Sequence, residues 1–264
     1  MPHFEHEGWK LFYEDRGQGP PLLLLHGLLM DHTIFEPQIE VLAETHRVIA
    51  PDLRGHGRSE HRAEERSLWD LAEDQIALLG ALGVEHAVWV GASVGGPIAL
   101  RAALRHPHRI SGLVLIGTQA GAEHPTRLAM YETFGEQVGT TGWTEDALRG
   151  TAFINFGPNA PTELTDHWIG HWRAQPVDDI LEIMHSLTRR ESLLEQLGEV
   201  RVPAWVAYGE EDGAALQRHE VEQMVATLPN VVEFVTIPRA GHTPTLQQPD
   251  AITALISRAA SGTR

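Results

Sequence analysis

The feature that most constrains the fold of this chain is a short apolar run that ends in a Gly-x-Ser-x-Gly pattern. Residues 88–96 read Val-Trp-Val-Gly-Ala-Ser-Val-Gly-Gly, and helix-forming residues follow at once. A serine between two such glycines fits a sharp turn from a strand into a helix, where the backbone leaves no room for side chains. Such a turn exposes the serine hydroxyl above the edge of a sheet. The pattern therefore predicts a buried strand, a tight turn at Ser93 and a helix.

Buried strands and helices alternate on both sides of this turn. Apolar runs bounded by turn residues predict strands at 22–25, 47–50, 87–90, 110–116, 203–208 and 232–237. Helical spacing or position predicts helices at about 35–43, 68–82, 95–105, 216–228 and 250–260. The opening segment 4–15 alternates polar and apolar residues around Gly8, which predicts two short antiparallel strands. Together these elements predict a mostly parallel, doubly wound α/β sheet of about eight strands.

The alternation stops after the sixth predicted strand. From about Ala120 to Leu187 the chain shows helical patterns broken by Gly and Pro, without a convincing buried strand. This indicates a helical cap inserted into the α/β core. We therefore expect a first core part at 1–119, a cap at 120–187 and a second core part at 188–264.

Charge and composition exclude several classes of protein. The net charge is −16 at pH 7, which repels nucleic acid and anionic membrane surfaces. The chain has no cysteine, which excludes disulfides and thiolate sites. The apolar run at 22–25 is far too short for a membrane span or a signal peptide. We expect a cytoplasmic protein without nucleic-acid or membrane partners, and its oligomeric state stays open.

Two later strand ends carry the partners that a nucleophilic serine needs. A serine hydroxyl needs a base to take its proton, and that base needs a carboxylate to orient it. Gly-Glu-Glu-Asp follows one predicted strand and ends at Asp212, and Ala-Gly-His follows the last and ends at His242. Parallel strands end at one edge of the sheet, so both groups are expected near Ser93. Glu210, Glu211 and, after strand 110–116, Glu123 are the competing acids.

These segments together closely resemble the α/β-hydrolase family, and the resemblance covers nearly the whole chain. The matching pieces are residues 25–27, 52–59, 91–96, 209–212 and 240–242. The resemblance implies the α/β-hydrolase fold, with Ser93 as nucleophile, His242 as general base and Asp212 as the orienting acid. It also implies an oxyanion hole built from the backbone N–H groups of Leu28 and Val94. Free N–H groups at a helix start, where Val94 is expected, suit that role physically.

Other histidines have weaker claims to a function. We interpret His26 and His56 as residues that fix loops, although His26 is also a candidate for the substrate pocket. His167 and His171 share one helical face, as metal ligands can. The common zinc motif has a glutamate directly after its first histidine, and Trp168 stands in that place. We therefore expect no metal and no cofactor.

Aromatic residues of the cap are the other candidates for the substrate pocket. Most are expected to pack the cap against the core, and some to line an apolar pocket. The candidates are Trp143, Phe153, Phe156, Trp168 and Trp172.

The residue at the nucleophile position narrows the expected reaction. Relatives that form an alkyl-enzyme ester use a carboxylate there, which Ser93 cannot replace. The chain looks similar to the 3-oxoadipate enol-lactonase and small carboxylesterase branch, which implies hydrolysis of a small ester or lactone with an apolar part. A carbon–carbon bond hydrolase of vinylogous diketones, a cofactor-free haloperoxidase or perhydrolase, and a non-catalytic ligand receptor remain as alternatives. The choice of acyl group is expected to lie in the cap.

Overall fold

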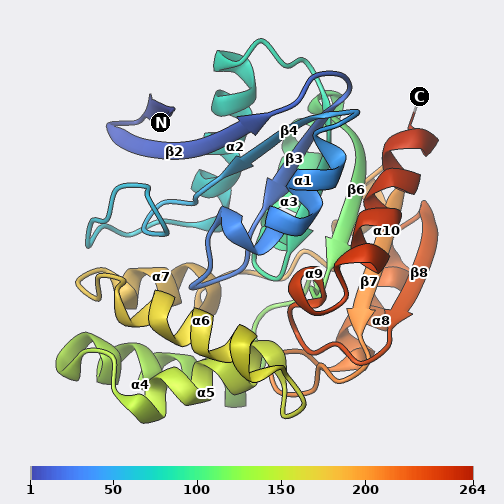
Figure 1. Ribbon diagram of the computed structural model, residues 1–264. Helices are drawn as coiled ribbons and strands as arrows, with labels where there is room; N and C mark the ends of the chain where they lie inside the picture. The colour runs from blue at the N-terminus through green and yellow to red at the C-terminus, as the bar shows by residue number, and fades with distance from the viewer. Residues whose placement is uncertain (1, 264) are drawn as a thin grey trace.

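A sheet of eight strands forms the centre of the structure, a computed structural model that describes residues 2–263 (Figure 1). Its strands are β1 (His3–His6), β2 (Trp9–Arg16), β3 (Pro21–Leu25), β4 (Arg47–Pro51), β5 (Ala87–Ala92), β6 (Ile110–Ile116), β7 (Ala204–Gly209) and β8 (Val231–Ile237). They lie in the order β1-β2-β4-β3-β5-β6-β7-β8. The pairs β1–β2 and β2–β4 are antiparallel and every later pair is parallel. The predicted mostly parallel sheet is thus confirmed.

The apolar strand β3 shows why the sheet is covered on both faces. All four leucines from Leu22 to Leu25 are fully buried. Leu23 and Leu25 belong to one core cluster, and Leu22 and Leu24 belong to a second cluster. Successive side chains of a strand point to opposite faces, so a strand that is apolar at every position needs a layer on each side.

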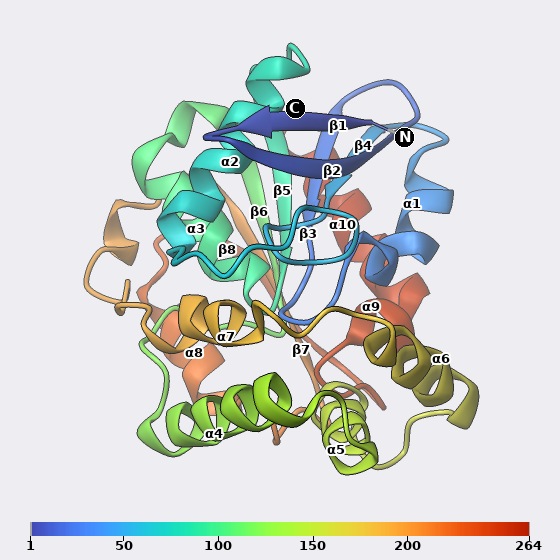
Figure 2. The same cartoon turned by 90° about the vertical axis from the view of Figure 1, so that its left-hand side faces the viewer.

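Helices supply these two layers. The core helices are α1 (Glu36–Leu42), α2 (Leu68–Ala81), α3 (Gly95–Arg105), α8 (Arg218–Thr227), α9 (Pro244–Gln247) and α10 (Pro249–Gly262). In Figure 2, α2, α3 and α8 lie on one side of the sheet, and α1 and α10 lie on the other. Short 3₁₀ helices occur at His32–Phe35, Pro107–Arg109 and Leu197–Glu199. Within residues 2–263, no helix combines the length and the apolar character needed to cross a membrane.

The cap consists of four helices between β6 and β7. They are α4 (Pro125–Thr141), α5 (Glu145–Phe156), α6 (Thr162–Arg173) and α7 (Ile180–Thr188). α4 packs on α7 and α5 packs on α6. Figures 1 and 2 show them together beyond the end of the sheet toward which β6 and β7 point. The predicted helical insertion after the sixth strand is confirmed.

Polar contacts fasten this cap to the core loops. Trp172 of α6 donates its indole N–H to the carbonyl oxygen of Leu29 at 2.8 Å. On the other side of the cap, Asp179 lies 3.0 Å from Arg66 and 3.1 Å from His61. Because Arg66 and Asp179 are almost fully buried, this pair holds α7 against the loop that precedes α2.

Candidate active site

The predicted turn at Ser93 lies between β5 and α3. Ser93 has a φ of 50°, in the left-handed region that non-glycine residues rarely adopt. A Cβ at Gly91 would lie 2.4 Å from the carbonyl oxygen of Gly95, and a Cβ at Gly95 would lie 2.3 Å from that of Leu25. Both glycines are therefore required by close backbone packing. The strained turn leaves the Ser93 side chain at the edge of the sheet.

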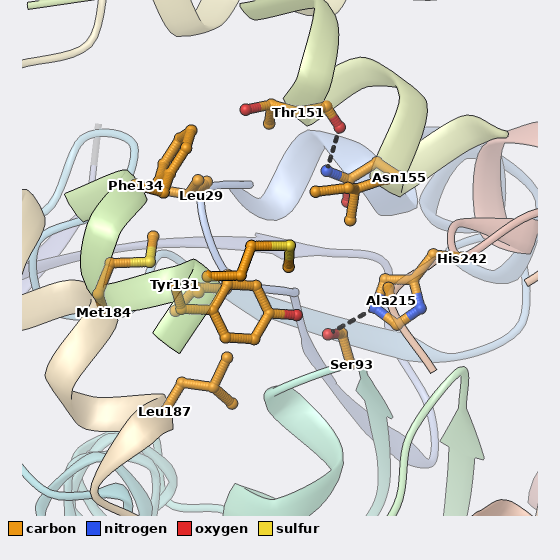
Figure 3. A pocket seen from close by; sticks show the side chains of 13 residues that line it. Leu29, Ser93, Tyr131, Phe134, Thr151, Asn155, Met184, Leu187, Ala215 and His242 are labelled. Atoms are coloured by element: carbon orange, nitrogen blue, oxygen red, sulfur yellow. Dashed lines mark hydrogen bonds between the residues drawn. The ribbon is translucent and has the colours of Figure 1, made fainter. Parts of the chain in front are cut away.

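His242 and Asp212 meet Ser93 at this edge. The Nε2 atom of His242 lies 2.8 Å from Ser93 Oγ (Figure 3), and its Nδ1 atom lies 2.7 Å from Asp212 Oδ2. Asp212 follows β7 and His242 follows β8, as the sequence predicts. With the Nδ1 proton donated to the carboxylate, Nε2 is left as the acceptor of the serine proton. This arrangement can activate the hydroxyl as a nucleophile.

The electrostatics of this group favour a strong base. Burial alone lowers the pKa of His242, but the charge of Asp212 and its hydrogen bond outweigh burial and raise that pKa above the ordinary 6.5. Asp212 is only 3% exposed, so water screens its charge weakly. A positive imidazolium at His242 is thus stabilised by the charge of Asp212.

The competing acids have other hydrogen-bond partners than His242. Glu123 pairs with Arg127 and with Arg190. The side chain of Glu210 accepts the N–H of Arg239, and that of Glu211 accepts from Asn159. Asp212 is the carboxylate that contacts His242.

Two backbone donors lie beside Ser93. Leu28 shares the lining of a cavity with Ser93, and Val94 follows it directly. Among the residues that the structure describes, the N–H groups of both lack an acceptor. A Cβ at Gly27 would lie 3.2 Å from the Cβ of Ser93, which shows how closely the Leu28 loop approaches the serine. These free N–H groups could bind negative charge that develops on an oxygen.

The space around Ser93 and His242 has two parts. An apolar compartment of about 560 Å³, including its open mouth, lies between the serine and the cap (Figure 3). Its apolar lining residues are Leu28, Leu29, Met130, Phe134, Ile154, Met184, Leu187 and Ala215. A polar compartment of about 350 Å³ continues on the other side, and its polar lining residues include Thr118, Gln119, Glu123, Arg127 and Arg190. Ser93 and His242 line both compartments.

The two loop histidines, His26 and His56, bond backbone groups of the loops around them. His26 is fully buried, accepts the N–H of Leu53 at 2.9 Å and lies 2.8 Å from the carbonyl oxygen of Gly27. His56 bonds the carbonyl oxygen of Arg54 at 3.0 Å. Both rings fix loops, and among the described residues neither ring lines the two compartments.

The aromatic pocket candidates of the cap also lie outside these compartments, as far as residues 2–263 are described. Phe156, Trp168 and Trp172 are buried in the core cluster beneath α5 and α6, and Phe156 stacks on Trp172. Trp143 packs beside Phe134. Phe153 is 52% exposed.

Other cap residues line the apolar compartment instead. Met130 and Phe134 are four residues apart on α4, and Met184 and Leu187 are three apart on α7. This spacing puts each pair on one helical face, which is a signal visible in the sequence. Tyr131 and Asn155 add polar groups to the same lining.

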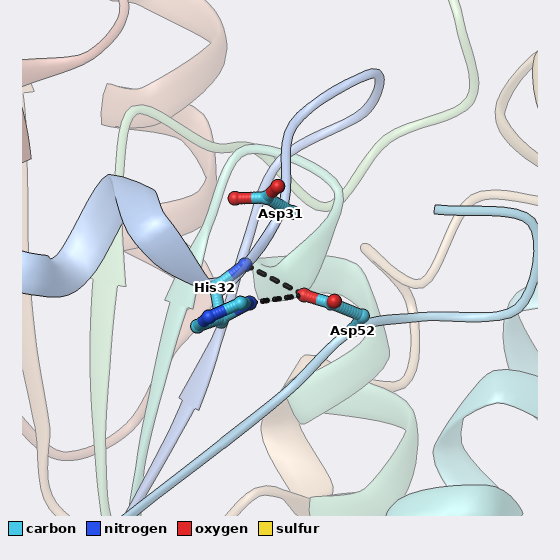
Figure 4. A group of neighbouring side chains, drawn as sticks. All are labelled: Asp31, His32 and Asp52. Atoms are coloured by element: carbon cyan, nitrogen blue, oxygen red, sulfur yellow. Dashed lines mark hydrogen bonds and ion pairs between the residues drawn. The ribbon is translucent and has the colours of Figure 1, made fainter. Parts of the chain in front are cut away.

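A buried group of possible metal ligands lies in the loops after β3 and β4. The ligand atoms of Asp31, His32 and Asp52 lie within 4.8 Å of one another (Figure 4). Asp52 Oδ1 accepts from the backbone N–H of His32 at 2.8 Å and lies 2.7 Å from its Nδ1. Asp31 accepts from Thr33 and lies 3.1 Å from Nε2 of His171. The group is a hydrogen-bonded framework that orders these loops and ties α6 to them.

Comparisons with known proteins agree with this fold. A family model described as alpha/beta hydrolase fold matches residues 20–138. The pimeloyl-[acyl-carrier protein] methyl ester esterase of a Shewanella species is 30% identical over 247 residues, which span 89% of this chain and 88% of the esterase. A thermophilic esterase from Thermogutta terrifontis has a TM-score of 0.89 at 27% identity and covers 99% of this chain and 97% of its own. The enol-lactonase of Burkholderia xenovorans LB400 has a TM-score of 0.89 at 21% identity and covers 98% of this chain and all of its own, and it shows a shared fold.

Proposed function

The chain belongs to the α/β-hydrolase family, and from this membership we propose that it hydrolyses a carboxylic ester or lactone through an acyl-enzyme on Ser93. The observation that carries the proposal is the contact of His242 with Ser93 Oγ at 2.8 Å and with Asp212 at 2.7 Å. Esterases among the similar proteins support ester chemistry as the reaction class.

The first half of the proposed reaction forms the acyl-enzyme. His242 Nε2 takes the proton of Ser93 Oγ, and the oxygen attacks the carbonyl carbon of the substrate. The negative charge moves to the carbonyl oxygen, where the N–H groups of Leu28 and Val94 bind it. In serine hydrolases one such donor lowers the activation free energy by about 2.7–4 kcal/mol. His242 then gives its proton to the leaving oxygen, and the carbon–oxygen bond of the ester breaks.

The second half releases the acid. A water molecule gives a proton to His242 and attacks the acyl carbon, and the bond to Ser93 Oγ breaks as His242 returns the proton to it. Asp212 stays ionised throughout and stabilises the imidazolium. The chain's own groups and water supply every proton.

We also propose that residues 120–187 act as a substrate-selecting cap between the core parts 1–119 and 188–264. The cap contributes Met130, Phe134 and Met184 to the apolar compartment, whereas the core contributes Ser93 and His242. Substrate choice would then change with the cap while the chemistry stays with the core.

Replacing Ser93 by alanine tests the proposal. Turnover of p-nitrophenyl butyrate and of simple lactones should fall at least 1,000-fold, which corresponds to about 4 kcal/mol. Ser257→Ala is the matched control, because Ser257 lies on α10 and, within residues 2–263, its hydroxyl donates to the carbonyl oxygen of Thr253 in the same helix. Full activity of Ser93→Ala would contradict the proposed mechanism. Faster cleavage of a vinylogous diketone than of any ester would instead favour a carbon–carbon hydrolase.

A further inference from the structure

The proposed mechanism leaves three hydroxyl groups of the cavity lining unused, among the residues that the structure describes. Those of Thr118 and Thr151 donate to backbone carbonyl oxygens, whereas that of Tyr131 has no such partner. Tyr131 comes from α4 of the cap, and it lines both compartments together with Ser93 and His242. In Figure 3 its hydroxyl points toward Ser93 and His242. A polar group of the cap thus stands where the two compartments meet.

This hydroxyl is a donor without an acceptor. Within residues 2–263 it makes no hydrogen bond, and the Tyr131 side chain is partly buried against apolar neighbours. Burial raises the pKa of Tyr131 to about 12, and the charge of Glu123 adds to this effect. The phenol therefore keeps its proton at neutral pH. A donor in a partly apolar cavity that has no partner in the protein gains free energy when a ligand brings an acceptor to it and excludes water from the contact.

The charges of the polar compartment indicate what kind of acceptor fits. Arg127 bonds Glu123 and Glu220, and Arg190 lies 3.1 Å from Glu123. Arg190 also donates to the carbonyl oxygen of Gly121 at 3.0 Å. Both cations of this compartment already have carboxylate partners, so a substrate carboxylate would add an unbalanced negative charge near Glu123. An uncharged oxygen meets no such penalty.

We propose that Tyr131 is a substrate-binding residue, and that the preferred ester or lactone carries a second, uncharged acceptor oxygen for its hydroxyl. A keto or ether oxygen has this chemistry. The hydrocarbon part of the substrate fills the apolar compartment formed by residues such as Phe134 and Met184. This inference rests on the proposed hydrolysis at Ser93.

Matched substrates test the inference on either side of the scissile bond. On the acyl side, ethyl pentanoate, ethyl 4-oxopentanoate and monoethyl succinate place a methylene, a keto group or a carboxylate at similar positions. On the alcohol side, butyl and 2-methoxyethyl pentanoate differ by one methylene replaced with oxygen. The substrates differ in intrinsic reactivity. This difference cancels when kcat/KM of Tyr131→Phe is divided by kcat/KM of the native protein for the same substrate. Tyr13→Phe is the control, because Tyr13 lies on β2 beside Phe4, outside the cavity.

Tyr131→Phe should lower kcat/KM about five- to tenfold for the keto or the ether ester, as expected for one neutral hydrogen bond. Its hydrocarbon partner should change less than twofold, and the native protein should prefer the keto ester to the succinate. Equal changes for both members of both pairs, or no change, would overturn the inference while Ser93-dependent hydrolysis stands. Ester turnover that survives Ser93→Ala would overturn the proposed function, and the inference with it.

Discussion

Replacing Asp212 by asparagine should separate the effect of its charge from that of its shape. Asp212 Oδ2 lies 2.7 Å from Nδ1 of His242, and the carboxylate is almost fully buried. Asparagine fits the same space but has no charge, and its amide can donate to Nδ1 and stabilise the wrong tautomer. A hydrogen bond to a charged group is worth about 1.5–3 kcal/mol. The imidazolium also loses its stabilisation by the carboxylate. We therefore expect kcat to fall about 1,000-fold, which corresponds to a rise of about 4 kcal/mol in the activation free energy.

The pH profile gives a second measure of the same change. kcat/KM should rise as His242 loses its proton, with a midpoint above 6.5 in the native protein because the pKa of His242 is raised. In Asp212→Asn the burial of the ring is no longer offset, so the midpoint should move below that of the native protein. The assay is hydrolysis of p-nitrophenyl butyrate from pH 5 to about 9.

Two variants control this experiment. Asp74 is a fully buried carboxylate that pairs with Arg54, outside the cavity, so Asp74→Asn should lower stability and leave the pH midpoint unchanged. Glu123→Gln tests the competing acid. If Asp212→Asn keeps more than a tenth of the activity with an unmoved midpoint, while Glu123→Gln loses activity, the assignment of the acid is wrong.

Two predictions concern stability, measured by urea unfolding at pH 7. Gly95→Ala should cost about 2–3 kcal/mol or more, because the new Cβ would lie 2.3 Å from the carbonyl oxygen of Leu25. Gly80→Ala, on α2 with nothing within 4 Å, should gain about 0.5–1 kcal/mol, and equal effects of the two variants would contradict the packing argument. His171→Leu should cost about 1.5–3 kcal/mol, since Asp31 loses its partner at 3.1 Å. Burial raises the pKa of Asp31, but its bonds to His171 and Thr33 lower that pKa below 3.8. The difference in unfolding free energy between the native protein and His171→Leu should therefore narrow as the pH falls below 3.8. A difference that stays constant with pH would contradict this prediction.

The sequence predicts the sheet and the meeting of Ser93 with its partners because both follow from local patterns. A four-leucine run such as 22–25, bounded by turn residues, is typical of a strand covered on both faces, and all four leucines are buried. Parallel strands that end at one edge bring Asp212 and His242 to Ser93, although 149 residues separate Ser93 from His242. The Gly-x-Ser-x-Gly pattern also predicts the close backbone packing at Gly91 and Gly95, where a Cβ would overlap a carbonyl oxygen.

The lining of the cavity is much less predictable. Helical spacing shows that α5 and α6 carry apolar stripes, but it does not show which stripe packs on the core and which faces the cavity. Trp168 and Trp172 fill the core cluster because large rings bury the most apolar area there. The cavity is lined by Tyr131 and Phe134, whose positions depend on how α4 docks over the sheet edge. That docking is a tertiary contact without a local signature.

The most direct test of the central claim is the mass of the protein after rapid acid quenching of its reaction with p-nitrophenyl butyrate. The account predicts a covalent butyryl adduct on the peptide that contains Ser93, formed within the first turnover and absent in Ser93→Ala. Hydrolysis at the native rate in both proteins, or an adduct on another residue whose loss stops turnover, would contradict it.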